Sequence, residues 1–303
     1  TWSTVLDVAP VNLLRVAASP TGDLLAVGTE VVANGRWLTY RSSDDGATWS
    51  LLDQFKFSGG KQATAQSAAG DAAGRIYVTG IAIDAQNIQH WTVRRSLDGG
   101  ATWTTADDQK NGLAYGIAAS PSGVLAVGYI SGIWTVRRTL DGGGTWTTVD
   151  KYQLDSRYQS GAYALAVDGL GQLYVSGRAQ KAVKKTTENH WITRTSSDGG
   201  ATWRTVDDFK VNGLGYAFGI TADVFGRIFA AGFTGNNPPL WVVRASPDAG
   251  ATWVTTDAFS LAPAGMAQAA AVAADPYGNV FVAGFGMDSG SVNHALVRKL
   301  PAP

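Results

Sequence analysis

The sequence predicts an all-β protein, a six-bladed β-propeller of four-stranded antiparallel blades, and three observations lead to this fold class. The composition includes 37 glycines but only two glutamates, Glu30 and Glu188. Because glutamate favours helices and glycine disfavours them, this balance favours strands joined by many turns. One short motif recurs five times, and a sixth, incomplete unit follows the last copy. Such repetition is typical of propellers.

The recurring motif reads Ser/Thr-x-Asp-x-Gly-x-Thr-Trp, and its copies span residues 42–49, 96–103, 139–146, 196–203 and 246–253. A second tryptophan stands seven residues before each motif aspartate, at Trp37, Trp91, Trp134, Trp191 and Trp241. Asp accepts bonds from nearby backbone amides and Gly supplies a positive φ, so the motif predicts a tight hairpin turn. Two further strands upstream, such as 164–167 and 172–176, complete four strands per unit.

The sixth unit follows the last motif. Strands expected at 269–273, 279–284 and 295–299 repeat the first three strands of a unit. Residues 1–7 match 102–108, which begin the fourth strand of another unit. We therefore expect the N-terminal strand to close the sixth blade, because closure removes exposed sheet edges. Residues 1–303 then form a single propeller domain.

The motif resembles the Asp-box (BNR) repeat of sialidases, xyloglucanases, sortilin-type receptors and photosystem assembly factors, and six blades are most similar to the sialidase superfamily. The resemblance implies that the box is a structural turn remote from the functional site. Sialidases carry a Phe/Tyr-Arg-Ile-Pro motif near the start, whereas here the corresponding region offers Arg15 followed by Val16. Sialidase activity is therefore not expected.

Composition excludes several other classes of function. Lys plus Arg equals Asp plus Glu, at 24 each, which argues against a nucleic acid or an acidic membrane as partner. There is no cysteine, no apolar run of membrane-spanning length, no phosphate-binding loop and no clustered metal-ligand spacing. We expect no cofactor and a monomer. Because the chain opens at Thr1, we also expect a secreted or periplasmic protein.

Most charged residues recur at equivalent positions and are expected to be scaffold. Five third-strand arginines share one position, and a guanidinium there could stack on a Trp or bond the adjacent blade; they are Arg94, Arg137, Arg194, Arg244 and Arg298. Five acids fall outside the repeat, in expected loops: Glu30, Asp84, Asp155, Glu188 and Asp288. Glu188 with Asp155 is the best pair for a two-carboxylate glycosidase. A polysaccharide lyase could instead use Tyr158 or Tyr163 with His190 and Arg157.

The three histidines occupy one position in alternate blades, at His90, His190 and His294. Either they are inherited strand caps from a two-blade ancestor, or each builds a ligand site with a loop acid. A three-histidine metal site is not expected, because third strands lie too far from the propeller axis.

The inner strands are expected to frame the top of the central channel with polar and aromatic side chains: Asn12, Leu14, Arg15, Gln66, Tyr115, Tyr163, Tyr216, Phe218 and Gln268. Aromatic rings beside amides and a guanidinium suit a sugar. The leading interpretation is a carbohydrate-interacting propeller that binds rather than catalyses. A glycoside hydrolase or polysaccharide lyase with its site on the axis is the alternative, and a protein-binding scaffold is the second.

Overall fold

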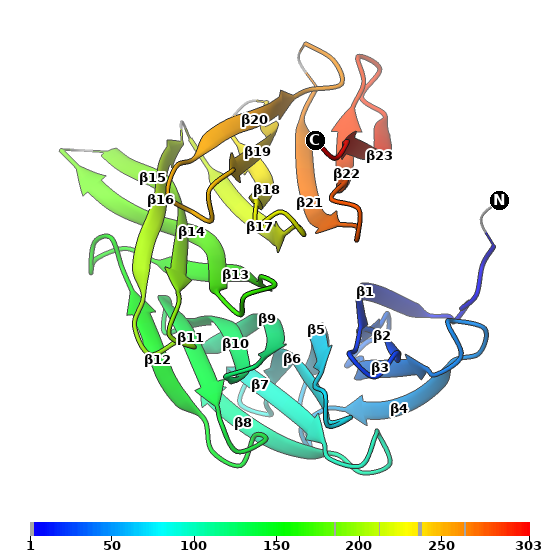
Figure 1. The fold of residues 1–303 in the computed structure, drawn as a ribbon. Coiled ribbons are helices and arrows are strands. Elements are labelled where there is room, and N and C mark those ends of the chain that lie inside the picture. The colour runs from blue at the N-terminus through cyan, green and yellow to red at the C-terminus, as the bar shows by residue number, and fades with distance from the viewer. Residues whose placement is uncertain (1–2, 185, 212, 236–237, 264) are drawn as a thin grey trace. The chain divides into compact units, whose positions relative to one another are not determined.

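The computed structural model describes residues 3–184, 186–211, 213–235, 238–263 and 265–303. These residues form 23 strands in six antiparallel sheets. They form no helix, and therefore no helix that is long and apolar enough to cross a membrane. The predicted fold class, an all-β propeller of six blades, is confirmed (Figure 1). The chain divides into two compact units. The first comprises Thr1–Ser131 and Thr135–Thr148, and the second comprises Gly132–Trp134 and Val149–Pro303.

The first three sheets follow the chain from its N-terminal side. The first contains β1 (Val11–Ala18), β2 (Leu24–Glu30), β3 (Trp37–Ser42) and β4 (Ser50–Phe55). The second contains β5 (Gln62–Gly70), β6 (Ile76–Ile83), β7 (Gln89–Ser96) and β8 (Thr104–Lys110). The third contains β9 (Gly112–Ser120), β10 (Gly123–Ile130), β11 (Ile133–Thr139) and β12 (Thr147–Tyr152).

The other three sheets lie in the second unit. The fourth contains β13 (Ser160–Val167), β14 (Leu173–Val183), β15 (Thr186–Ser196) and β16 (Arg204–Val211). The fifth contains β17 (Gly215–Ala222), β18 (Ile228–Thr234), β19 (Leu240–Ser246) and β20 (Val254–Phe259). The sixth contains β21 (Ala267–Ala274), β22 (Val280–Met287) and β23 (Asn293–Leu300).

The expected closure of the sixth blade by an N-terminal strand is corrected by the structure. Among the described residues the sixth sheet has three strands, and residues 3–8 form none. Leu6 and Val8 pack instead against Ala26, Leu38 and Tyr40 of the first sheet. These apolar side chains are thus packed without strand pairing. The first two residues of the expected strand lie outside the described part.

The five motif copies form the predicted hairpin turns. In the second sheet Ser96 Oγ donates to Asp98 Oδ1 over 2.7 Å, and Asp98 accepts from the backbone and hydroxyl of Thr102 at 2.9 and 2.6 Å. Trp103 Nε1 donates to the Gly100 carbonyl over 3.0 Å. In the first sheet the bonds from Thr48 and Ser42 lower the pKa of Asp44 to about 2.

Acid is expected to destabilise the protein through these turns. An aspartate whose pKa is lowered on folding contributes stability above its unfolded pKa of about 4, and that stability is lost as the pH falls towards 2. The unfolding temperature should therefore fall between pH 4 and 2, and Asp44→Asn should flatten this fall, whereas Asp45→Asn serves as the control. An unchanged profile in Asp44→Asn would contradict the assignment.

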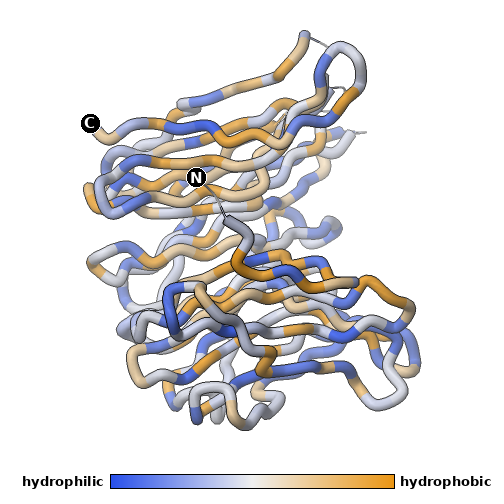
Figure 2. The backbone as a smooth tube through the Cα atoms, turned by 90° about the vertical axis from the view of Figure 1, so that its right-hand side faces the viewer, coloured by the Kyte–Doolittle hydropathy of each residue, from blue (hydrophilic) through white to orange (hydrophobic). Residues whose placement is uncertain are grey.

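A glycine and a tryptophan fix the contact between successive sheets. Each second strand has a glycine opposite an irregularity in the first strand; a Cβ on Gly177 would lie 2.0 Å from the Gly161 carbonyl oxygen and 2.6 Å from Trp134 Cζ3. The tryptophans that precede the motifs are fully buried or nearly so: Trp37, Trp91, Trp134, Trp191 and Trp241. Hydrophobic stretches, in orange, recur along the backbone of both units (Figure 2).

The repeated arginines bond the neighbouring sheet, which confirms one of the two roles expected for them. Each pairs with an aspartate on the preceding sheet's fourth strand: Arg94–Asp53, Arg137–Asp107, Arg194–Asp150, Arg244–Asp207 and Arg298–Asp257, with closest distances of 2.6 to 2.8 Å. Four of these guanidiniums also lie over a Phe or Tyr ring. The recurring acids of the fourth strand are therefore scaffold.

Candidate functional site

The first strand of every sheet carries a β-bulge at the same place. The register skips one residue in each strand, namely Leu14, Gln66, Tyr115, Tyr163, Phe218 and Ala270. A bulge bends its strand and re-aims the side chain, and bulges are frequent beside functional sites. Five of the channel residues predicted from the sequence thus occupy bulges: Leu14, Gln66, Tyr115, Tyr163 and Phe218.

In the second unit the bulges bring together a group of half-buried rings, which we call the aromatic platform: Tyr163, Tyr216, Phe218 and Phe233. Tyr216 stacks on Phe218 with centroids 5.4 Å apart and on Phe233 at 5.5 Å. Tyr163 meets Tyr216 at 5.5 Å and Phe218 edge-on at 5.9 Å. The rings support one another, so their positions are fixed before any ligand arrives.

Arg178 of β14 completes the platform with a cation. Its Nη1 donates to the Tyr216 hydroxyl over 2.6 Å, and its guanidinium carbon lies 4.4 Å from the centre of that ring. The hydrogen bond and the cation–π contact hold the guanidinium in one place. A planar donor fixed beside apolar rings can bond sugar hydroxyls while the rings contact C–H groups.

Phe233 was not predicted from the sequence, whereas Arg178 is one of four arginines outside the repeated position that the sequence leaves as candidates, with Arg15, Arg36 and Arg157. Both directly follow the glycine that faces the bulge, Gly232 and Gly177 respectively. In the other sheets the same position holds Thr29, Ile81, Tyr129 and Phe285. Because the position after a repeated glycine varies in chemistry, it is a sequence signal for the platform.

The first unit places its predicted residues in a different arrangement. Tyr115 lies 6.0 Å from Tyr129 at a tilt of 46°, while Gln66 and Arg15 are half-buried on β5 and β1. Burial lowers the pKa of the Arg15 guanidinium. Gln268 is likewise half-buried, on β21 of the second unit.

The two predicted catalytic carboxylates are both ion-paired. Asp155 accepts from Arg157 Nη2 over 2.7 Å and from the Ala182 backbone over 3.1 Å, and Arg157 holds the pKa of Asp155 well below its usual range. Lys210 bonds Glu188 and lowers its pKa, with Lys181 3.4 Å away. Arg157 also lies 5.9 Å from the ring of Tyr158. Both carboxylates are held ionised.

The predicted catalytic residues do not share one face of the sheet. Glu188 lies directly opposite Lys181, which is three residues from Arg178 on β14. Since successive side chains in a strand point to opposite faces, Glu188 faces away from Arg178. His190 shares the face of Glu188, whereas Tyr163 contacts the rings beside Arg178. The β14–β15 hairpin therefore separates Tyr163 from Glu188 and His190.

The two buried histidines bond carboxylates. His90 Nδ1 is 2.6 Å from Asp108 and Nε2 is 3.2 Å from Asp84, and its ring lies 4.8 Å from Phe57. His190 Nδ1 is 2.5 Å from Asp208, and Nε2 is 3.5 Å from Glu188. Each of these buried imidazoles thus bonds a fourth-strand aspartate, and His90 also bonds its loop acid, Asp84.

His294 is the exposed member of the set. Its Nε2 lies 3.0 Å from Asp288, which lowers the pKa of that carboxyl. Within the described residues no group of three or more His, Asp or Glu side chains could hold a metal ion.

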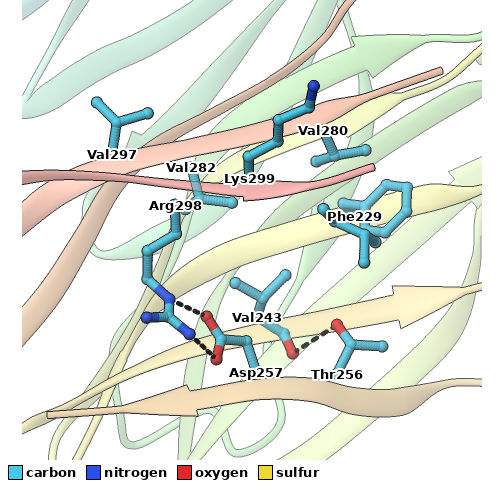
Figure 3. A pocket seen from close by; sticks show the side chains of 10 residues that line it. Phe229, Val243, Thr256, Asp257, Val280, Val282, Val297, Arg298 and Lys299 are labelled. Carbon is cyan, nitrogen blue, oxygen red and sulfur yellow. Dashed lines mark hydrogen bonds and ion pairs between the residues drawn. The ribbon is translucent and has the colours of Figure 1, made fainter. Parts of the chain in front are cut away.

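A cavity of about 400 Å³ lies between the fifth and sixth sheets (Figure 3). Valines line much of it, and its charged pair, Arg298 with Asp257, is already bonded at 2.7 Å. Thr256 Oγ1 donates to the Val243 carbonyl over 3.4 Å. With these polar groups satisfied, the cavity offers a ligand less than the platform does.

Comparison with known proteins adds relatives at low identity. No protein-family model matches the chain. A xyloglucanase of a Paenibacillus species is 29% identical over 218 residues, covering 64% of this chain and 20% of that protein. The chain thus spans only about a fifth of the length of the relative that it matches.

Solved structures resemble the whole chain. The α-L-arabinanase of Penicillium chrysogenum, complexed with arabinobiose, covers 98% of this chain and 95% of its own, with a TM-score of 0.59 at 16% identity. The α-L-arabinofuranosidase of Fusarium graminearum, bound to an iminosugar inhibitor, has a TM-score of 0.56 at 14% identity. It also covers 98% of this chain and 95% of its own. These relatives are glycoside hydrolases. The chain therefore has the fold of a six-bladed β-propeller resembling arabinanase propellers.

Proposed function

We propose that this chain is a carbohydrate-active propeller of the glycoside hydrolase class, and that a polysaccharide lies on the aromatic platform. The observation that carries the proposal is the fixed guanidinium of Arg178 beside the stacked rings of Tyr216, Phe218 and Phe233. The proteins that this chain resembles include enzymes named for xyloglucan and arabinan. The motif turns support assignment to the Asp-box propellers, and for a polysaccharide-binding protein we propose a secreted or periplasmic location.

Hydrolysis would need two carboxyl groups, for which Asp155 and Glu188 are the pair to test. Because Glu188 faces away from Arg178, a sugar within its reach lies on the opposite face of the β14–β15 hairpin from the platform. Ionised carboxylates suit a nucleophile or a general base, whereas a general acid must hold a proton near neutral pH. The lowered pKa of both groups favours a second candidate function, binding of a polysaccharide without its hydrolysis. Both candidates place sugar on the platform, and hydrolysis by Glu188 would in addition need sugar on the opposite face of the β14–β15 hairpin.

One set of variants tests both candidates. Tyr216→Ala should weaken binding of soluble xyloglucan or arabinobiose about tenfold, because ring stacking and one charged hydrogen bond are lost together. Leu97→Ala, which removes an exposed apolar side chain from a motif turn of the first unit, is the control. Calorimetry measures the affinity, and unaltered binding in Tyr216→Ala would refute the platform.

Turnover is measured by release of reducing ends. If the parent hydrolyses either sugar, Asp155→Asn and Glu188→Gln should abolish release and leave binding intact. Full activity in both variants would remove these residues from the mechanism. Binding by a parent that shows no turnover would instead establish the second candidate.

A further inference from the structure

A second surface of the second unit carries unusual side chains at the turns between first and second strands. These turns read Asp-Gly-Leu-Gly at 168–171, Asp-Val-Phe-Gly at 223–226 and Asp-Pro-Tyr-Gly at 275–278. In the first unit the same turns hold Pro-Thr-Gly at 20–22, Asp-Ala-Ala-Gly at 71–74 and Pro-Ser-Gly at 121–123. Small and polar residues suffice for the turn, so large apolar side chains are not required by the fold.

The three turns line an open cavity of about 730 Å³, which we call the turn cleft. Leu170, Val224 and Phe225 line it and stay exposed to 96%, 60% and 57%, and Tyr277 beside it to 78%. The cavity is within the size range of small-ligand sites. Exposed apolar side chains gathered around a cavity mark a binding surface rather than chance exposure.

Phe225 is held rigidly although its ring is exposed. A Cβ on Gly278 would lie only 2.2 Å from Phe225 Cε2, so the ring packs directly on that glycine. Arg227 lies 5.7 Å from the same ring, bonds Asp223 at 2.6 Å and donates to the Gly278 carbonyl over 2.9 Å. The ring is therefore positioned in advance, which reduces the entropy lost on binding.

Polar groups alternate with the apolar side chains of the turn cleft. The half-buried carboxylates of Asp168 and Asp275 stand at the start of two of its turns and accept from backbone amides of those turns, and Ala249, whose carbonyl accepts from the Tyr174 hydroxyl, also lines the cleft. A continuous apolar strand or helix would leave these acceptors desolvated. A sugar chain has C–H faces for the ring and hydroxyl donors for the acceptors.

We infer that the turn cleft is a second carbohydrate site, which binds a pyranose segment of a polysaccharide by stacking on Phe225. The inference takes its ligand class from the proposed function, but it requires neither the platform nor catalysis. A second site would hold a long chain at two places, and the gain in affinity would be confined to long chains.

The test compares three substitutions at one ring. Phe225→Ala should weaken binding of soluble xyloglucan about tenfold, and Phe225→Leu should weaken it similarly, because leucine is apolar but has no flat face. Phe225→Tyr should bind like the parent. Calorimetry measures the affinity, circular dichroism and the unfolding temperature confirm the fold, and Leu140→Ala of the first unit is the matched control.

The outcomes separate this inference from the proposed function. Loss of binding in Phe225→Ala with arabinobiose affinity unchanged supports the turn cleft whatever Tyr216→Ala does. Parent-like xyloglucan binding by Phe225→Leu overturns stacking of a pyranose on the ring and indicates a general apolar contact. Parent-like binding by Phe225→Ala, or no xyloglucan binding by the parent, also overturns the inference.

Discussion

Gly177→Ala is expected to lower the free energy of unfolding by about 3 kcal/mol or more. The added Cβ would stand 2.0 Å from the Gly161 carbonyl oxygen and 2.6 Å from Trp134 Cζ3. The oxygen belongs to the paired strand β13 and the indole is fully buried, so neither can move without opening the contact between sheets. The bulge at Tyr163 would be displaced with it.

The measurement is urea unfolding followed by tryptophan fluorescence, with Gly169→Ala as the control. Gly169 stands in the turn between β13 and β14, a Cβ added to it would meet no heavy atom within 4 Å, and it does not need a positive φ. Its alanine variant should match the parent within about 0.5 kcal/mol. Equal stability of the two variants would show that the glycine opposite the bulge is not needed.

The motif turns could be predicted from the sequence because every contact in them is local. Asp98 bonds only residues within four positions of itself, and the same spacing repeats five times. The glycine and the tryptophan of the sheet contacts repeat as well, although which glycine meets which ring depends on pairing between sheets. Local repetition therefore predicted the blades.

The site was only partly predictable, because its chemistry lies where the repeats differ. Tyr163 and Phe218 were found as inner-strand aromatics, but no spacing revealed that each is a bulge. Glu188 was expected in a loop, whereas it lies within β15, in a hairpin whose two strands are 11 residues each. Strand alternation then assigns it a face, which a loop position could not do.

Asp207→Ala should destabilise the protein by about 3–5 kcal/mol, because it leaves the buried guanidinium of Arg244 without its partner. Arg244 bonds both oxygens of Asp207, at 2.9 and 2.6 Å, between the fourth and fifth sheets. Burial raises the pKa of Asp207 even so, which means that desolvation outweighs the favourable pairing at this carboxyl. Such a pair adds little net stability, but removal of one partner strongly destabilises the fold.

The double variant Asp207→Leu with Arg244→Met separates these two statements. Apolar side chains of similar volume remove both desolvation penalties, so the double variant should recover most of the stability lost by Asp207→Ala. The contact of Arg244 with the Phe209 ring, at 4.3 Å, can be replaced by the methionine sulfur. Thermal unfolding of the parent, Asp207→Ala and the double variant decides the matter. A double variant less stable than Asp207→Ala would mean that the ion pair itself holds the two sheets together.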